Sequence, residues 1–173
     1  AGDKVYACGM KKMLVLFQIG RKPLEDGMRI LGAHIDSPRL DLKQNPLYED
    51  TEMAYLDTHY YGGVKNYQWV TIPLAIHGVV AKKDGSVVEI CIGEKEDDPV
   101  VFISDLLIHL AAQQMDKKAK VVIEGENLDI LIGSRPLAKT EGEEEEKADK
   151  EAVKANILGI LKEKYGIEED DFL

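Results

Sequence analysis

The chain has 173 residues, of which 45% are hydrophobic and 31% charged, as in a soluble globular protein with one sizeable core or two small ones. Its 32 acidic and 22 basic residues give a formal net charge of −10. This excess of acid argues against nucleic acid or an anionic membrane as the main partner, because both require basic patches.

The cysteines and the hydropathy pattern indicate a cytoplasmic protein. Cys8 and Cys91 are far apart in the sequence and lack the spacing of metal ligands, so we predict two reduced thiols. No apolar run approaches the roughly 18–20 residues of a membrane span, and no signal-peptide pattern opens the chain. The first residue is not Met, and we expect the sequence to be the interior of a longer protein.

Two strands are predicted near the start of the chain. Lys12–Gly20 and Met28–Ala33 are apolar runs joined by the turn-forming sequence Pro-Leu-Glu-Asp-Gly. The second run is apolar throughout, which is typical of a strand buried on both faces of an α/β sheet.

Beyond Pro46 the pattern changes to short strands separated by turn residues, which favours a small barrel or sandwich. Asp84-Gly85 marks a tight hairpin, and Pro73 indicates a strand edge or a bulge. Trp69 and the sequence Tyr-Tyr-Gly-Gly are interpreted as core, with an aromatic binding platform as the alternative. The predicted strands are Met53–Tyr61, Gln68–Val80, Ser86–Ile92, Ala119–Glu124 and Leu128–Ile132.

Two helices complete the prediction. Ser104 is a good N-cap for the first, whose apolar stripe consists of Leu106, Leu107, Leu110, Ala111 and Met115. Asp149 can cap the second, and Gly166 is placed to end it. Its apolar stripe consists of Val153, Ile157, Ile160, Leu161 and Tyr165. The acidic run at 140–151, between the two helices, is predicted to be a solvated loop.

The sequence Gly-Ala-His-Ile-Asp-Ser-Pro after the second strand holds the most informative pair, His34 and Asp36. In an extended chain these two side chains project to the same side, and Pro38 favours extended geometry in the residue before it. A carboxylate that accepts one imidazole N–H orients the ring, as it commonly does beside a metal-binding His. The same pair also arises in a satisfied turn, and the residues alone leave both interpretations open.

A longer series of motifs is far more specific than this pair. The segments GAHIDSPRLDLKQNP, YYGGVKNYQW, PLAIHGVV, a Lys-Asp-Gly hairpin and DLLIHLA occur in that order. Together they resemble the aspartyl aminopeptidase family, which includes vacuolar aminopeptidase I. The resemblance implies a peptidase with two divalent metal ions, expected to be Zn²⁺, in an α/β sandwich interrupted by an inserted β-rich, barrel-like domain used in oligomerisation.

The same resemblance implies roles for three residues. His34 corresponds to a metal ligand and Asp36 to the acid that orients it. His109 corresponds to a His that reaches a neighbouring subunit's active site; its structural alternative is a His on the rim of an amphipathic helix. His59 and His77 match no functional position and are interpreted as structural. The family's bridging Asp, its general-base Glu and its remaining ligands are expected beyond this sequence.

These inferences give a predicted organisation and function. Residues 1–45 are assigned to the catalytic α/β domain, 46–138 to the inserted oligomerisation domain, and 139–173 to an acidic loop and a helix leading back. The function is predicted to be hydrolysis of N-terminal residues, acidic ones among them, from peptides by a homo-oligomer built from dimers. The alternatives are a non-catalytic oligomerisation module and one segment of a split hydrolase.

Overall fold

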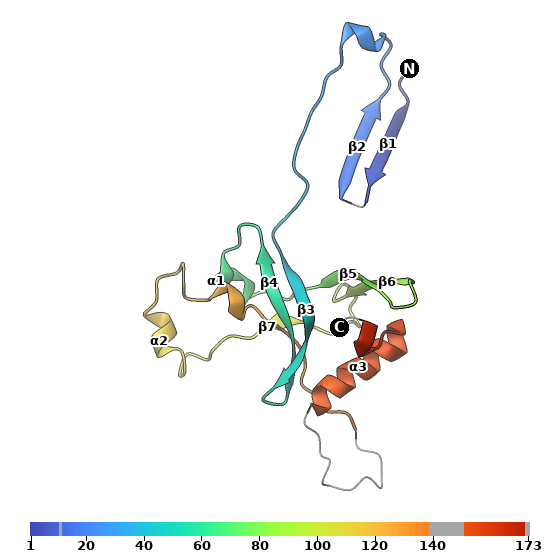
Figure 1. Cartoon of the computed structure of the whole chain (residues 1–173). Coiled ribbons are helices and arrows are strands. Elements are labelled where there is room, and N and C mark those ends of the chain that lie inside the picture. Colours follow the sequence, from blue (N-terminus) through green and yellow to red (C-terminus); the bar gives the residue numbers. More distant parts are fainter. Residues whose placement is uncertain (11, 139–150, 172–173) are drawn as a thin grey trace. The chain divides into compact units, whose positions relative to one another are not determined.

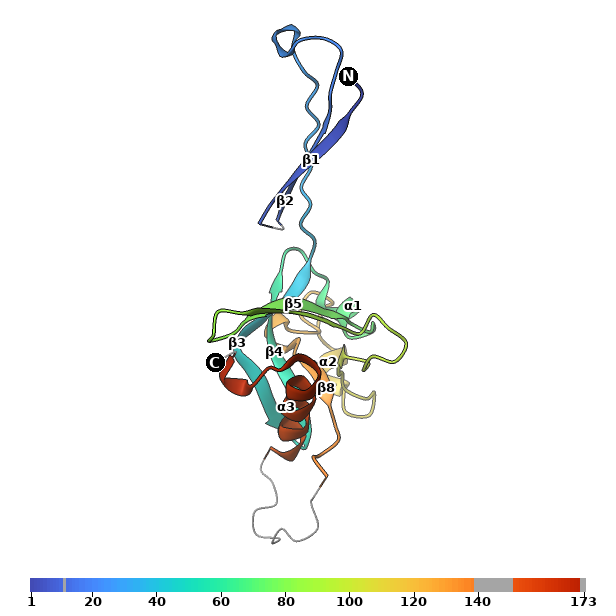
Figure 2. The same cartoon turned by 90° about the vertical axis from the view of Figure 1, so that its right-hand side faces the viewer.

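The computed structural model describes residues 1–10, 12–138 and 151–171. The chain divides into two compact units, Ala1–Ser37 and Pro38–Leu173, which are drawn in Figure 1 and, turned by 90°, in Figure 2. The fold is a mixed α/β segment with mostly strands and few helices. Among the helices in the described part of the chain, none is long and apolar enough to span a bilayer.

The first unit is an antiparallel hairpin followed by an extended tail. Strand β1 (Lys4–Gly9), which was not predicted, pairs with β2 (Met13–Gln18) along its whole length. A short 3-10 helix (Leu24–Asp26) follows. The predicted strand at Met28–Ala33 is wrong as secondary structure, because these residues are exposed and no described neighbour supplies hydrogen bonds to them. A strand of a buried sheet needs partners on its edges before it exists as a strand.

The second unit is built on a four-stranded antiparallel sheet in the order β3-β4-β8-β7. Its strands are β3 (Arg39–Asp50), β4 (Met53–Tyr61), β7 (Phe102–Ile103) and β8 (Ile130–Gly133). Strand β4 was predicted with the correct bounds, and the predicted β8, Leu128–Ile132, begins two residues early and ends one residue early. Strand β3 was missed because Pro46 interrupts its pattern: the register shifts between Leu42 and Leu47, and Asn45 adopts φ 54°, which together form a bulge that accommodates the proline.

A separate hairpin, β5 (Ile76–Ala81) and β6 (Val87–Ile92), lies beside this sheet. Gly85, with φ 85°, makes the predicted tight turn, and the Lys82 N–H donates to the Ser86 carbonyl at 2.8 Å. One bridge, Leu74 to Val101, connects the hairpin's approach to the sheet. The strands of the described chain therefore form separate sheets and do not close into one barrel.

The helices depart further from the prediction. The predicted strand Gln68–Val80 begins instead with the one-turn helix α1 (Asn66–Trp69), and the predicted strand Ala119–Glu124 is a series of turns. No helix begins at Ser104; only α2 (Ala112–Met115) forms in that region. Pro73 lies in no strand. Two further 3-10 helices are Gly125–Asn127 and Glu169–Asp171.

The second predicted helix is confirmed as α3 (Ala152–Tyr165). Gly166 ends it in the left-handed conformation with φ 63°, as a C-terminal glycine should. The predicted cap, Asp149, lies outside the described residues. Helix α3 packs against β3, β4 and β8, and the Lys154 N–H at its first turn donates to Glu49 of β3 at 2.8 Å. The predicted boundary at residues 45 and 46 falls within β3; the division into catalytic and inserted domains stays a prediction.

The core of the second unit lies where β4 faces α3 and the segment before β8. Alternate residues of β4 are buried, as the period of a strand requires. Trp69 packs against this core, which agrees with its interpretation as a core residue, whereas Tyr60 and Tyr61, interpreted in the same way, are exposed. The buried hydrophobic cluster consists of Leu47, Ala54, Leu56, Val101, Ile103, Leu128, Ile130 and Val153.

Thr58 is the buried polar residue of this core, and we expect its hydroxyl to be a measurable source of stability. It is 0% exposed, and its Oγ1 donates to the Leu128 carbonyl at 2.7 Å. Thr58→Val keeps the shape but leaves that carbonyl without its donor, so the free energy of unfolding should fall by about 1–3 kcal/mol. Thr71→Val is the matched control, because the Thr71 hydroxyl makes the same bond to Gln68 on the surface, at 2.8 Å. Equal losses in urea denaturation of the two variants would contradict the role of burial.

Candidate metal-binding segment and the position of His109

His34 and Asp36 contact each other in the extended tail of the first unit. The Nδ1 atom of His34 lies 3.1 Å from Oδ1 of Asp36 and 3.2 Å from the Asp36 backbone carbonyl oxygen. The two side chains are 87% and 54% exposed. The pairing agrees with the prediction that both project to one side of an extended chain.

This geometry fixes how the ring can be used. Both neighbours of Nδ1 are oxygen acceptors, so a neutral His34 carries its proton on Nδ1 and leaves the Nε2 lone pair available. A carboxylate-oriented imidazole of this kind is the usual state of a His that binds zinc. The chemistry of His34 therefore fits a single zinc ligand, with Asp36 as the residue that orients it.

The rest of a metal site is not formed by the residues that the structure describes. Within residues 1–10, 12–138 and 151–171, no three His, Cys, Asp or Glu side chains are grouped so that they could hold a metal ion. A catalytic zinc site uses about three protein ligands. The described residues thus include one candidate ligand, His34, and a carboxylate that contacts it, which is less than a complete metal site.

His109 lies in the second unit, in a turn at residues 108–110 between β7 and α2, and its side chain is exposed. The Leu110 N–H donates to the Leu107 carbonyl at 2.8 Å, which closes the turn. Asp105 holds the start of the loop, since it accepts from the Leu106 N–H and from Gln114 Nε2, both at 2.8 Å. His109 is therefore presented on an anchored loop and not on a helix.

The predicted helix is wrong here for a physical reason. Most of its apolar stripe is exposed, with Leu107, Leu110 and Met115 accessible to 71%, 70% and 65%. An amphipathic helix is stabilised mainly by packing of its apolar face, and the described chain offers these residues no such surface. Ala111 is buried and marks where the loop rejoins the core.

The two remaining histidines pair with single carboxylates on the surface. His59 Nδ1 lies 3.2 Å from Glu126, and His77 Nε2 lies 2.8 Å from Glu94. Lys43 also contacts Glu126, at 3.1 Å, and its hydrogen bond lowers the pKa of that carboxyl. Neither pair belongs to a group of potential metal ligands among the described residues.

A polar network that sequence reasoning missed joins β3, β4 and the segment before β8. Asp129 accepts from the Tyr48 hydroxyl at 2.7 Å and from the Thr58 N–H at 3.2 Å. Burial, followed by the Asp129 hydrogen bond, raises the pKa of Tyr48, which therefore stays protonated as the donor. No local motif marks such a pair, because its members are far apart in the sequence. Its role is to hold the sheet together.

Comparison with known proteins places these residues in a family. The family described as "Aminopeptidase I zinc metalloprotease (M18)" matches residues 1–173. A probable M18 family aminopeptidase 1 of Clostridium acetobutylicum is 63% identical over 172 residues, which cover 99% of this chain and 36% of that protein. A probable M18 family aminopeptidase 1 of Thermotoga maritima is 50% identical over 177 residues, covering 100% of this chain and 37% of that protein.

Solved structures agree with the sequence comparison. The crystal structure of aminopeptidase I from Clostridium acetobutylicum matches with a TM-score of 0.83 at 60% identity, covering 99% of this chain and 36% of that one. An M18-family aminopeptidase from Thermotoga maritima matches with a TM-score of 0.84 at 50% identity, covering 98% of this chain and 35% of that one. The chain spans about a third of the length of these relatives. It belongs to the M18 family of aminopeptidase I zinc metalloproteases.

Proposed function

We propose that this chain is a segment of a zinc-dependent aminopeptidase that removes N-terminal residues, acidic ones among them, from peptides. The observation that carries the proposal is the His34–Asp36 pair, with Nδ1 bonded to the carboxylate and Nε2 available. Membership of the M18 family supports the same chemistry.

In this proposal each residue has a defined task. His34 would bind one zinc ion through Nε2, and Asp36 would keep its ring in the required tautomer and orientation. Bound zinc supplies a Lewis acid that polarises the scissile carbonyl and lowers the pKa of water. His109 would donate a hydrogen bond to the reacting carbonyl oxygen in a neighbouring subunit. The general base and the other ligands would come from residues outside this chain.

The proposed organisation assigns residues 1–45 to a catalytic α/β sandwich and 46–138 to an inserted oligomerisation domain. Residues 139–173 are assigned to the acidic loop and the helix that lead back to the catalytic domain. A homo-oligomer built from dimers in the cytoplasm is part of the proposal. The oligomerisation is supported by the exposed apolar side chains around His109, since such patches commonly mark interaction surfaces. Leu107, Ile108 and Leu110 are each more than half exposed.

A second candidate is a non-catalytic module or one part of a split hydrolase. The incomplete ligand set of the described residues fits this candidate as well as the first. In that case the full-length protein would keep the fold of this segment and lack zinc-dependent hydrolysis.

The two candidates differ in what the 173-residue chain and the full-length protein can do. We expect the chain alone to bind Zn²⁺ weakly, with no stoichiometric tight site in calorimetry, and to hydrolyse no peptide, because one imidazole cannot hold a catalytic metal. The full-length protein should release N-terminal Asp and Glu, lose this activity with a chelator and regain it with Zn²⁺. Tight zinc binding by the chain alone would contradict the partial site, and an inactive, zinc-loaded full-length protein would favour the module.

A further inference from the structure

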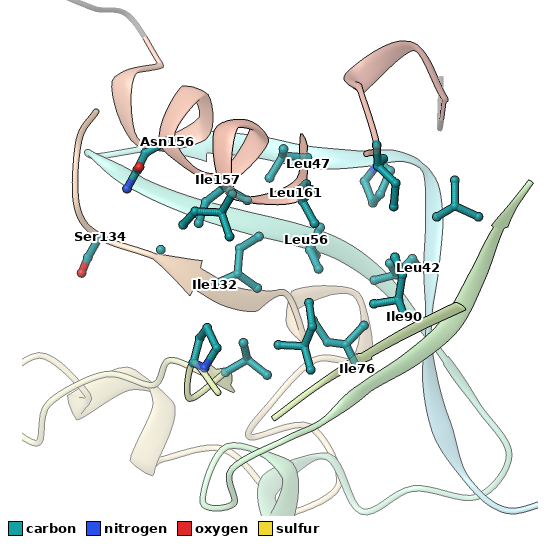
Figure 3. Close-up of a pocket in the computed structure, with 18 of the residues that line it drawn as sticks. Leu42, Leu47, Leu56, Ile76, Ile90, Ile132, Ser134, Asn156, Ile157 and Leu161 are labelled. Atoms are coloured by element: carbon teal, nitrogen blue, oxygen red, sulfur yellow. The ribbon is translucent and has the colours of Figure 1, made fainter. Parts of the chain in front are cut away.

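An apolar cavity of about 380 Å³ lies inside the Pro38–Leu173 unit (Figure 3). Its walls come from β3, β4 and β8 on one side, from the β5–β6 hairpin on another, and from α3. Ligand sites in proteins usually enclose about 300–1,000 Å³. The cavity is therefore large enough for a small molecule.

The cavity exists because the hairpin is tied down at its ends and not along its length. At one end, the Leu74–Val101 bridge connects the hairpin's approach to the sheet next to β7. At the other end, Lys82 Nζ donates to the Gly166 carbonyl at 2.5 Å, and Lys83 pairs with Asp170 at 3.1 Å. Between these points the inner face of the hairpin spans the cavity without pairing to the sheet, since β5 and β6 form a sheet of their own.

The cavity has one polar end. Apart from Gly133, all its lining residues are apolar except Ser134, Arg135 and Asn156. Asn156 Nδ2 donates to the Arg135 carbonyl at 3.0 Å, which ties α3 to the segment after β8 at this end. Figure 3 shows Ser134 and Asn156 at one end and Ile90 toward the other.

Two features leave this site available to a ligand. Leu42 and Ile160, which line it, are 45% and 44% exposed, so the cavity communicates with solvent. In the part of the chain that the structure describes, the guanidinium of Arg135 makes no hydrogen bond or ion pair. A cation that lines the polar end of an apolar cavity is complementary to an anion that carries an apolar tail.

We propose that this cavity binds a linear amphiphile with a carboxylate head, with the tail along the apolar walls and the head on Arg135. A planar guanidinium binds a carboxylate through two parallel hydrogen bonds, which makes this head group the best match for Arg135. Each methylene group buried along the walls adds about fourfold in affinity.

The test uses decanoate, octanoate and decan-1-ol with the full-length protein in titration calorimetry, below the concentrations at which they aggregate. Decanoate should bind about fifteenfold tighter than octanoate, because two more methylenes are buried, and tighter than the uncharged alcohol. Arg135→Gln should weaken the binding of decanoate about 10- to 100-fold, because a hydrogen-bonded charge pair is lost. The binding of decan-1-ol should stay unchanged. Arg21→Gln, which removes an exposed Arg that does not line the cavity, is the matched control.

A further variant tests the tail. Ile90→Phe narrows the apolar end of the cavity and should weaken the binding of decanoate more than that of octanoate, provided that circular dichroism shows a folded protein. Arg135 is exposed, so its variant remains decisive if Ile90→Phe does not fold. Decan-1-ol binding as tightly as decanoate, or no effect of Arg135→Gln, would overturn the carboxylate assignment. Affinity independent of chain length would show that the cavity is not the site.

Discussion

His34→Ala in the full-length protein should abolish peptidase activity and remove zinc from one of the two expected metal positions. The substitution deletes the Nε2 donor, which a neighbouring side chain cannot replace because His34 is 87% exposed and pairs only with Asp36 among the contacts described for it. Losing a residue that merely orients a ligand costs about 10- to 100-fold in metal affinity or activity, so losing the ligand should cost more. Peptide turnover and zinc content by elemental analysis are the measurements.

Two further variants separate ligation from folding. Asp36→Asn keeps the shape of the side chain and weakens its hydrogen bond to Nδ1 of His34. The peptidase activity of this variant should therefore be about 10- to 100-fold lower than that of the wild type. His77→Ala is the matched control, because His77 forms the same kind of exposed carboxylate pair, with Glu94 at 2.8 Å. It should leave activity and zinc unchanged. Full zinc content with near-normal turnover in His34→Ala would make the metal assignment wrong.

The second large effect is expected from His109→Ala, which should lower kcat about 10²- to 10³-fold in the full-length protein. A hydrogen bond to the reacting carbonyl oxygen acts mainly in the transition state, and losing one such donor has an effect of this size. Because His109 is exposed on a loop anchored by Asp105, its removal should leave zinc content and the size of the assembly intact. Steady-state kinetics, elemental analysis and light scattering check the three expectations.

Mixed oligomers decide whether His109 acts across subunits. A His34→Ala subunit still carries an intact His109, and a His109→Ala subunit still carries an intact His34. Co-expression should therefore restore part of the activity, because some sites combine both residues. Hybrids that are shown to form and yet remain inactive, or a His109→Ala enzyme with normal turnover, would make His109 structural.

Sequence patterns predicted the elements that depend on local interactions. Strand β4 follows a period of two, the β5–β6 turn depends on Gly85 with its positive φ, and α3 ends where Gly166 permits the left-handed conformation. The pairing of His34 with Asp36 is also local, since the two are separated by one residue. Each of these features is encoded within a few neighbouring positions.

The sequence by itself therefore determined the resemblance to the aspartyl aminopeptidase family, the β5–β6 hairpin, α3 and the contact between His34 and Asp36. Tertiary structure decided the rest. Residues 28–33 have strand-like sequence but no described partner, and 104–111 have helical spacing but no described surface on which to bury it. Strand β3 forms despite Pro46 because β4 pairs with it on both sides of a bulge. Strands and amphipathic helices are stabilised by neighbours that lie far away in the chain, and local patterns do not identify those neighbours.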